Sequence, residues 1–506
     1  MGRYLEVMDT TLRDGEQTNS VSFSVIEKLT LAQILLQEVK VDRIEVASAR
    51  VSEGELNAVT AITSWAAGAG FIDKVEVLTF VDGGVSIEWM KKAGAKVMNL
   101  LTKGSLNHLT HQLKKSPEEH FADIQLVLEK AKDEGITVNV YLEDWSNGMR
   151  NSPDYVFQSL DFLTGNKVVS KILLPDTLGI LTPQETTKFI RQTLDKYPNN
   201  HFEFHAHNDY DLGTANVLAA VHEGIHGIHL TVNGMGERAG NASLASAIAV
   251  IKDFAKDVQT SVNEESLYSV SKIVESFSGL RIPENKPIVG ENVFTQTAGI
   301  HADGDKKNNL YFSELMPERF GRKRVYALGK TSGKANIENN LRDLGIRLSD
   351  EDLKKVTSHI IQLGDKKEIV TKEDLPFIIS DVLDSNTLKQ DIQIKGYVLT
   401  HAANLKPSAT LQVAFGTDIY EEHAQGDGQY DAFMNALKKI YSKKKMNLPR
   451  LVDYMVRIPP GGNSDALCET IITWQHDGKE FKTRGLDSDQ TVSAIKATQK
   501  VLNIIH

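Results

Sequence analysis

The sequence is poor in cysteine. Cys468 is the single one among 506 residues, so no disulfide can form within the chain. This usage fits a reducing compartment, and we expect a cytoplasmic protein. Basic residues are also outnumbered, with 57 lysines and arginines against 67 aspartates and glutamates and a formal net charge of -10. Nucleic acids and anionic membranes require a basic binding face, so neither is expected as a main partner.

Long apolar runs are missing as well. A membrane-spanning helix needs about 20 predominantly apolar residues, and the sequence offers no such run, nor an apolar signal core in its first residues. What the chain does contain is 41% hydrophobic and 25% charged residues, the composition of a soluble globular protein. Its length predicts two or three domains.

The first 260 or so residues repeat one unit, a short β-rich segment followed by a segment with helical periodicity. Two helices are predicted to begin at Ser116-Pro117 and Thr182-Pro183, where a capping side chain precedes proline. Several strand segments are almost continuously apolar or β-branched, as in parallel strands covered on both faces. The predicted strands are 5–9, 43–48, 74–81, 96–102, 137–144, 171–177, 201–209 and 225–233.

Eight such units in about 250 residues predict an α/β fold of the (β/α)₈ TIM-barrel type. A doubly wound open sheet is the alternative. It would usually have a glycine-rich phosphate loop after its first strand, and residues 9–14 (DTTLRD) are not one. After the barrel (1–260), we expect helical subdomains over 261–387 and an α+β domain with an internal two-fold repeat over 388–506.

Polar residues are concentrated at the expected C-terminal ends of the barrel strands, where such barrels place their active sites. His205 and His207 are two apart in a strand, so their side chains point to the same side. Two histidines and a carboxylate form a recurrent divalent-metal set with open positions, and Asp14 is the natural third ligand. A histidine pair alone is more often incidental. Its strand-end position and the partner Asp14 favour a metal site.

An open-sided metal ion suits a 2-oxo acid, because the keto and carboxylate oxygens can chelate it and the carbonyl becomes polarised. Arg13, beside the proposed aspartate ligand, could stabilise developing oxygen charge. The alternative for this arginine is a structural ion pair with Glu16 or Asp9. Tyr141 and Glu143 share one face of the fifth strand and are expected to point to the barrel mouth. A surface carboxylate is the alternative for Glu143.

Four segments in order resemble the isopropylmalate/homocitrate/citramalate synthases of the DRE-TIM metallolyase superfamily. They are 12–17 (LRDGEQ, followed by Lys28), 205–209 (HAHND), 236–241 (GERAGN) and 299–304 (GIHADG). The C-terminal repeat resembles the leucine- or isoleucine-sensing regulatory domain of these enzymes, so the resemblance covers nearly the whole chain. One departure is Asp211, where the family usually has glycine. We expect it to affect packing between strand and helix rather than metal binding.

The resemblance implies a Claisen-type condensation of acetyl-CoA with a 2-oxo acid, followed by hydrolysis of the CoA thioester. Asp14, His205 and His207 would bind the divalent metal ion (Zn, Mn or Mg), with Asn241 as a further ligand. The 1–260 barrel would be catalytic, 261–387 would contain the lid, and 388–506 would sense an amino acid. A homodimer is expected.

The resemblance also implies roles for five other residues. Arg13 would stabilise the enolate or the polarised carbonyl, and Thr177 would hydrogen-bond the substrate carboxylate. Glu143, with His301 and Tyr311 from the lid segment, would manage the proton transfers. Whether Glu143 or His301 takes the methyl proton stays open.

The acceptor pocket is predicted from the residues that end strands three to five: Leu78, Leu101 and Tyr141. All are bulky and none is cationic, which leaves little room for an isopropyl group and no counter-ion for a second carboxylate. The set resembles the citramalate synthase pattern, so pyruvate is the expected acceptor and isoleucine the effector. The alternatives are 2-oxoisovalerate with leucine, as in 2-isopropylmalate synthase, and ordinary barrel packing.

Three further interpretations are open. The basic residues Arg319, Arg322, Lys323, Arg324 and Lys330 could meet the CoA phosphates or form a solvated face. A lyase or carboxyltransferase would share the arginine, aspartate and histidine pair, although it has no need of an end-product sensor. A non-catalytic amino-acid-binding regulator would be expected to have lost a site residue, and none is lost.

Overall fold

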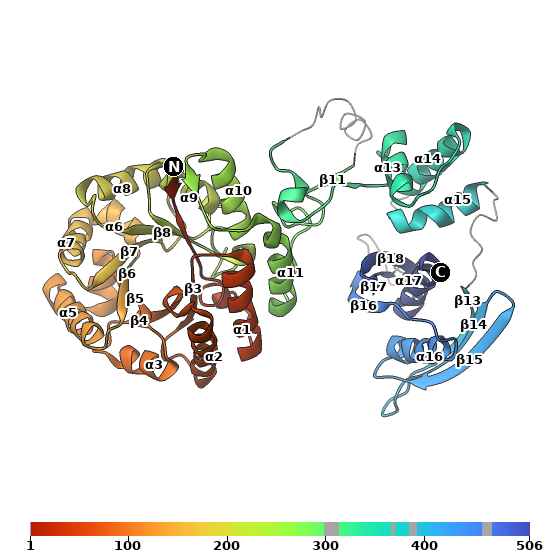
Figure 1. Cartoon of the computed structure of the whole chain (residues 1–506), viewed down its shortest axis with the longest axis horizontal. Coiled ribbons are helices and arrows are strands. Elements are labelled where there is room, and N and C mark those ends of the chain that lie inside the picture. Colours follow the sequence, from red (N-terminus) through yellow and green to blue (C-terminus); the bar gives the residue numbers. More distant parts are fainter. Residues whose placement is uncertain (1, 298–312, 366–369, 384–391, 458–467, 506) are drawn as a thin grey trace. The chain divides into compact units, whose positions relative to one another are not determined.

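The structure is a computed structural model, and it describes residues 2–297, 313–365, 370–383, 392–457 and 468–505. The chain divides into two compact units. The first comprises the residues through Phe294 together with Ser313–Arg324, and the second comprises the remainder. Figure 1 shows the elements of each unit.

The first unit is a closed barrel of eight parallel strands in sequential order, β2 to β9, surrounded by helices (Figure 1). The predicted TIM barrel is therefore confirmed, and each strand overlaps a predicted segment. The strands are β2 (Glu6–Asp9), β3 (Arg43–Ser48), β4 (Val75–Phe80), β5 (Val97–Lys103), β6 (Thr137–Glu143), β7 (Val169–Asp176), β8 (Phe202–Ala206) and β9 (Gly227–Leu230). A short parallel pair, β1 (Arg3–Tyr4) with β10 (Val258–Gln259), lies outside the barrel sheet.

Two helices of this unit, α5 (Pro117–Asp133) and α8 (Pro183–Lys196), begin where the capping signals predict. Ser116 and Thr182 both form reciprocal capping boxes, with Glu119 and Glu185 respectively. The helices are α1 (Val25–Ile34), α2 (Glu53–Ala69), α3 (Val85–Ala93), α4 (Leu106–His108), α5 (Pro117–Asp133), α6 (Trp145–Asn151), α7 (Pro153–Thr164), α8 (Pro183–Lys196), α9 (Gly213–His222), α10 (Leu244–Phe254) and α11 (Leu267–Ser278). Helix α11 extends this unit past residue 260, because it buries Leu267, Val270 and Val274 in the barrel core.

The apolar core of the barrel has two parts. The larger part lies between the strands and the helices. A separate small cluster consists of Met8, Leu78, Tyr141 and Leu173, with Leu101 partly buried against it. These five residues belong to strands β2, β4, β5, β6 and β7, and three of them line the cavity described below. The apolar wall of that cavity is therefore continuous with a buried cluster.

The second unit has a mainly helical first part and continues with a repeated α+β arrangement. Its first part contains β11 (Thr295–Gln296), β12 (Val325–Tyr326), α13 (Lys334–Asp343), α14 (Asp350–Asp365) and α15 (Leu375–Leu383). Two copies of a three-stranded antiparallel sheet followed by a helix come next. They are β13 (Ile392–Thr400), β14 (Ser408–Phe415), β15 (Asp418–Gln425) and α16 (Gln429–Lys443), then β16 (Arg450–Arg457), β17 (Cys468–His476), β18 (Lys479–Asp487) and α17 (Gln490–Ile504).

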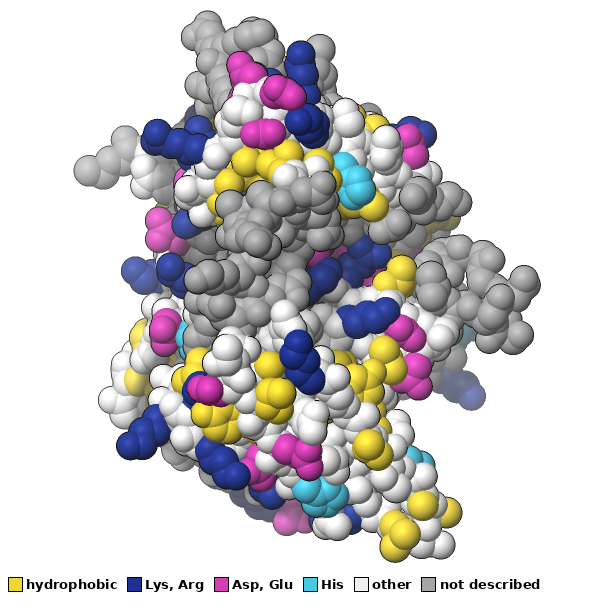
Figure 2. All heavy atoms as spheres, turned by 90° about the vertical axis from the view of Figure 1, so that its right-hand side faces the viewer, with side chains coloured by type: hydrophobic (Ala, Val, Ile, Leu, Met, Phe, Trp, Pro, Cys, Tyr) yellow, Lys and Arg dark blue, Asp and Glu magenta, His cyan; other side chains and the backbone are white. Residues whose placement is uncertain are grey.

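This repeat confirms the predicted internal symmetry and adds a third strand to each half. The third strand of the second half, β18, continues through Gly485 to Asp487. Figure 2 shows side chains of both charge signs mixed with hydrophobic ones on the face turned to the viewer. Within the described ranges, no helix has the length and apolar character needed to cross a bilayer.

Candidate active site

A cavity of about 230 Å³ lies at the C-terminal ends of the barrel strands. It brings together residues that are far apart in the sequence. The residues predicted from the sequence that line it are Arg13, Asp14, Leu78, Leu101, Tyr141, Glu143, Thr177, His205 and His207. Gln17, Pro175 and Glu237 line it too and were not singled out beforehand.

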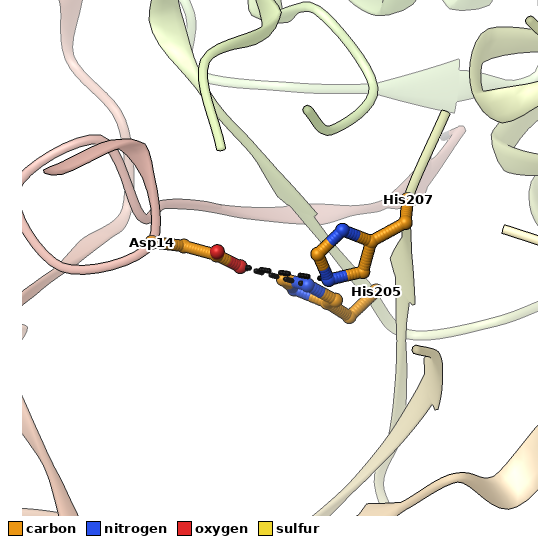
Figure 3. Close-up of side chains that lie close together, drawn as sticks. All are labelled: Asp14, His205 and His207. Carbon is orange, nitrogen blue, oxygen red and sulfur yellow. Dashed lines mark ion pairs between the residues drawn. The ribbon is translucent and has the colours of Figure 1, made fainter. Parts of the chain in front are cut away.

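Asp14 and the two histidines converge at one side of this cavity (Figure 3). Asp14 lies in the turn after β2, His205 on β8 and His207 just beyond the end of β8. The Nε2 atoms of His205 and His207 lie 3.1 and 3.9 Å from Oδ2 of Asp14. One ligand atom from each residue falls within 4.8 Å of the other two. This spacing allows one cation to contact all three.

Unpaired buried atoms test whether a metal ion fits here. Within the described part of the chain, Asp14 Oδ1, Asn241 Oδ1 and Nδ1 of both histidines are buried without a hydrogen-bond partner. Leaving such atoms unpaired is costly, and the unpaired oxygens of Asp14 and Asn241 are ligands that a divalent cation accepts. The carboxylate of Asp14 and the two imidazoles therefore fit a divalent ion. Asn241, the fourth predicted ligand, does not line the cavity, but it pairs with His207 through its backbone and has an unpaired buried oxygen.

Asn241 is placed by the glycine-rich loop. It forms a β-bridge with His207, and its amide nitrogen donates to the Met235 carbonyl 3.0 Å away, which leaves Oδ1 free for a ligand. A Cβ at Gly236 would lie 2.4 Å from the Asn241 side-chain nitrogen. Glycine at this position is therefore required for Asn241 to lie where it does.

The electrostatics keep the three candidate ligands in their metal-binding forms. Burial would raise the pKa of Asp14, but Arg13 and the two histidines outweigh burial and hold that pKa below its ordinary value. Burial lowers the pKa of His205 and lowers that of His207 to about 4. A carboxylate and two neutral imidazoles are the forms that bind a cation.

Arg13 is held by a residue that the sequence analysis missed. Its Nε lies 2.5 Å from Oε2 of Glu45, which is fully buried on β3 and also accepts from Asn99 at 2.7 Å. Among the described residues, Arg13 pairs with neither Glu16 nor Asp9. Glu16 pairs with Lys28 at 2.6 Å, and Asp9 accepts from the backbone N–H of Thr11 at 2.9 Å. The sequence offered one signal for Glu45: it is a glutamate inside a strand that was expected to be buried. Arg13 also approaches Asp14, with 3.4 Å between Nη1 and Oδ2.

Glu143 also has a partner that was not predicted, since its carboxylate pairs with Lys103 at the end of β5. Thr177 accepts a hydrogen bond from the backbone N–H of Asp144 at 2.9 Å, so its hydroxyl position is set by the neighbouring strand end. Both Glu143 and Thr177 line the cavity. His301 and Tyr311, the expected lid residues, lie outside the described residues.

Two residues of the basic run have structural partners in the first unit. Arg319 pairs with Asp253 and Glu264, each at 2.8 Å. Arg322 donates to the carbonyls of Ile288, Gly290 and Glu291. These contacts give both arginines a role in packing. Arg319 and Arg322 therefore do not belong to a merely solvated face.

Asp211 adopts the backbone conformation that explains the usual glycine. Its φ is 58°, in the left-handed region that favours glycine. Two hydrogen bonds to Asn208 support it: Asp211 N–H to the Asn208 carbonyl at 2.8 Å, and the Asn208 amide to Asp211 Oδ1 at 3.1 Å. Aspartate tolerates this region better than most residues, so the substitution fits the local structure.

A second cavity of about 280 Å³ borders the same glycine-rich loop. It is lined by Met235, Gly236 and Arg238 of the loop and by Arg281 and Lys286 from the segment after α11. Arg238 pairs with Asp209 at 2.8 Å and with Glu237 at 3.0 Å, so its charge is balanced by two carboxylates. Burial lowers the pKa of Lys286.

Comparison with known proteins follows the same division of the chain. The HMGL-like family matches residues 4–274, the homocitrate synthase post-HMGL domain-like family matches 288–368, and the LeuA allosteric (dimerisation) domain matches 369–506. The chain belongs to the isopropylmalate, homocitrate and citramalate synthase family.

Two relatives from this synthase family show how far the similarity extends. The (R)-citramalate synthase CimA of Methanocaldococcus jannaschii is 32% identical over 99% of both chains. A probable 2-isopropylmalate synthase of Methanopyrus kandleri is also 32% identical, over 99% of this chain and 98% of its own. Among solved structures, an HMG-CoA lyase from Bacillus subtilis aligns with 56% of this chain and 96% of its own, at a TM-score of 0.49 and 20% identity.

Proposed function

We propose that this synthase condenses acetyl-CoA with pyruvate to give citramalate and free CoA. The supporting observation is the acceptor side of the cavity. Leu78, Leu101 and Tyr141 all line it, and none of them is cationic. A pocket with these walls suits the methyl group of pyruvate better than an isopropyl group or a second carboxylate.

We propose Asp14, His205, His207 and Asn241 as the residues that hold a divalent ion, either Zn, Mn or Mg. Such an ion supplies Lewis-acid polarisation to the keto oxygen and carboxylate of the acceptor. The side chains around it have complementary tasks. Thr177 would hydrogen-bond the acceptor carboxylate, and Arg13 would donate to the oxygen that gains charge as the new bond forms.

The proton transfers fall to Glu143, paired with Lys103, and to His301 and Tyr311. The acetyl methyl group loses a proton, and the resulting carbon attacks the keto carbon of pyruvate. The keto oxygen gains a proton and becomes the tertiary hydroxyl of citramalate. Water then cleaves the thioester and releases CoA as a thiol. We propose that the second cavity, which Arg281 and Lys286 also line, receives an anionic part of acetyl-CoA.

The C-terminal repeat supports regulation by an amino acid. Its match to an allosteric (dimerisation) domain suggests a dimer with a small-molecule effector, and with pyruvate as acceptor the expected effector is isoleucine. We propose a catalytic barrel (1–260), a lid and linker (261–387) and a sensor (388–506) in a cytoplasmic enzyme. The second candidate is 2-isopropylmalate synthase with leucine as effector, which the Methanopyrus relative favours.

A thiol-release assay tests the acceptor. The full chain is supplied with acetyl-CoA, a divalent metal and one of three acids: pyruvate, 2-oxoisovalerate or 2-oxoglutarate. Pyruvate should give the highest kcat/KM for release of free CoA. A higher value with 2-oxoisovalerate would replace the pyruvate assignment by the second candidate, and absence of thiol release with every acid would reject the condensation.

A further inference from the structure

A chain of hydrogen bonds crosses the barrel interior beneath the acceptor pocket. The hydroxyl of Tyr141, on β6, lies 2.9 Å from Nδ1 of His229 on β9. Nε2 of His229 in turn lies 2.8 Å from Oε2 of Glu203 on β8. Tyr141 is 2% exposed, and the other two side chains are fully buried. Tyr141 lines the cavity and the two deeper residues do not, so any effect of His229 on the substrate passes through Tyr141.

The direction of these bonds follows from the deepest partner. Glu203 pairs with Arg43 at 2.5 Å and is therefore a carboxylate, which only accepts hydrogen bonds. His229 must donate from Nε2, and a neutral imidazole protonated there has a lone pair on Nδ1. The Tyr141 hydroxyl consequently donates to Nδ1, away from the cavity. The cavity meets the ring of Tyr141 rather than its hydroxyl.

Strand β9 leaves room for this chain of hydrogen bonds. A Cβ at Gly227 would lie 2.7 Å from Cδ of Glu203, so only glycine leaves room for the carboxylate. His229 lies two residues after Gly227, on the same face of β9. Other contacts surround the Tyr141 ring: its centroid lies 6.0 Å from that of His205, perpendicular to it, and 5.9 Å from the guanidinium carbon of Arg13.

We propose that His229 is a positioning residue for acceptor selectivity, because it fixes the Tyr141 ring as one wall of the pocket. The inference rests on the proposed function, in which this cavity receives the 2-oxo acid. An apolar pocket discriminates weakly against one added methylene, and it does so only if its wall does not yield. A ring held at its hydroxyl keeps the wall in place. A ring released at that end would move to admit a longer acid.

A double-mutant cycle tests the inference in the full-length enzyme. The variants are Tyr141→Phe, His229→Leu and the double variant, and the readout is the kcat/KM ratio of pyruvate to 2-oxobutanoate. Each single substitution should lower this ratio by about two- to tenfold, the range that one hydrogen bond accounts for. The double variant should show no further loss, because both substitutions remove the same contact.

A matched control is Tyr197→Phe. The Tyr197 hydroxyl donates to Asp161 at 2.7 Å, outside the barrel interior, so its loss should leave the ratio unchanged. His229→Gln retains a donor and an acceptor and should recover part of the selectivity. This variant also allows the kcat/KM ratio to be measured if His229→Leu does not fold.

Two results would overturn the role of His229. One is an equal loss of kcat/KM with both acids, which leaves the ratio unchanged and indicates a purely structural part. The other is additive effects in the double variant, which would mean that the hydroxyl and the imidazole act separately. A wild-type preference for 2-oxoisovalerate would instead reject the acceptor assignment alone, because the coupling is read from changes in the ratio among variants.

Discussion

The Nε atom of Arg13, in the turn after β2, lies 2.5 Å from Oε2 of Glu45, a fully buried carboxylate on β3. This contact aims the guanidinium at the cavity that Asp14 and the two histidines also line. Glu45→Gln keeps the shape and removes the charge. We expect kcat for citramalate formation to fall by about ten- to hundredfold, as for other residues that orient a catalytic group.

Glu223→Gln serves as the control for this substitution. Glu223 pairs with Arg191 through two contacts of 2.8 Å outside the barrel interior, so its loss should leave kcat within about twofold. Steady-state kinetics of both variants provide the measurement. Equal activity of Glu45→Gln and wild type would show that Arg13 needs no such partner.

Metal binding should depend on the converging side chains. We expect Asp14→Ala and His207→Ala each to abolish detectable turnover and to reduce the metal bound per chain, because each removes one donor from a small set. Metal analysis of the purified variants after dialysis gives the number of metal ions bound per chain. His222→Ala, a histidine of the outer helix α9, should retain the wild-type content. Unchanged metal in both site variants would remove the ligand assignment.

The effect of replacing Asp211 on stability should depend on whether the new residue tolerates a positive φ. Its φ of 58° costs an ordinary L-residue about 1–2 kcal/mol and glycine very little. Asp211→Ala loses the supporting contact with Asn208 and retains this cost, whereas Asp211→Gly loses the contact alone. Thermal unfolding should therefore place the barrel transition of the alanine variant below that of the glycine variant. The reverse order would contradict the left-handed conformation.

Glu185 links the stability of the barrel to pH. Its hydrogen bonds with Arg150, above all, lower its pKa from the ordinary value to about 2. A depressed folded-state pKa stabilises the fold above the unfolded-state pKa, and this contribution is lost as the pH falls toward 2. Glu185→Gln should lower stability at pH 7 by roughly 0.5–1 kcal/mol. The gap to wild type in thermal unfolding should narrow between pH 5 and pH 2, and a constant gap would exclude this linkage.

The sequence was sufficient to locate the main elements of the fold. Strand periodicity and cap signals such as Thr182-Pro183 predicted the barrel that the structure has. The third strand of each C-terminal sheet was harder to find. Strand β18 (Lys479–Asp487) alternates charged residues with a few apolar ones and contains Gly485. Its pattern is therefore also typical of a loop, and only pairing with β17 distinguishes the two.

The candidate site also shows which residues local sequence patterns can identify and which they cannot. Asp14 and the histidines stood out because strand ends and the two-residue spacing are visible in the sequence. Glu45 and His229 did not, because their partners Arg13 and Tyr141 lie 32 and 88 residues away in the sequence. A glutamate or histidine inside a predicted strand gives no sign of which residue it contacts. That information arises only when the barrel closes.

Anomalous scattering from crystals of the full chain grown with Mn²⁺ would show whether one ion binds between Asp14 and the two histidines. We expect one strong peak bonded to Asp14 and to Nε2 of His205 and His207, at distances of about 2.0–2.3 Å. A peak elsewhere, or no peak between these residues in crystals of active enzyme, would contradict it.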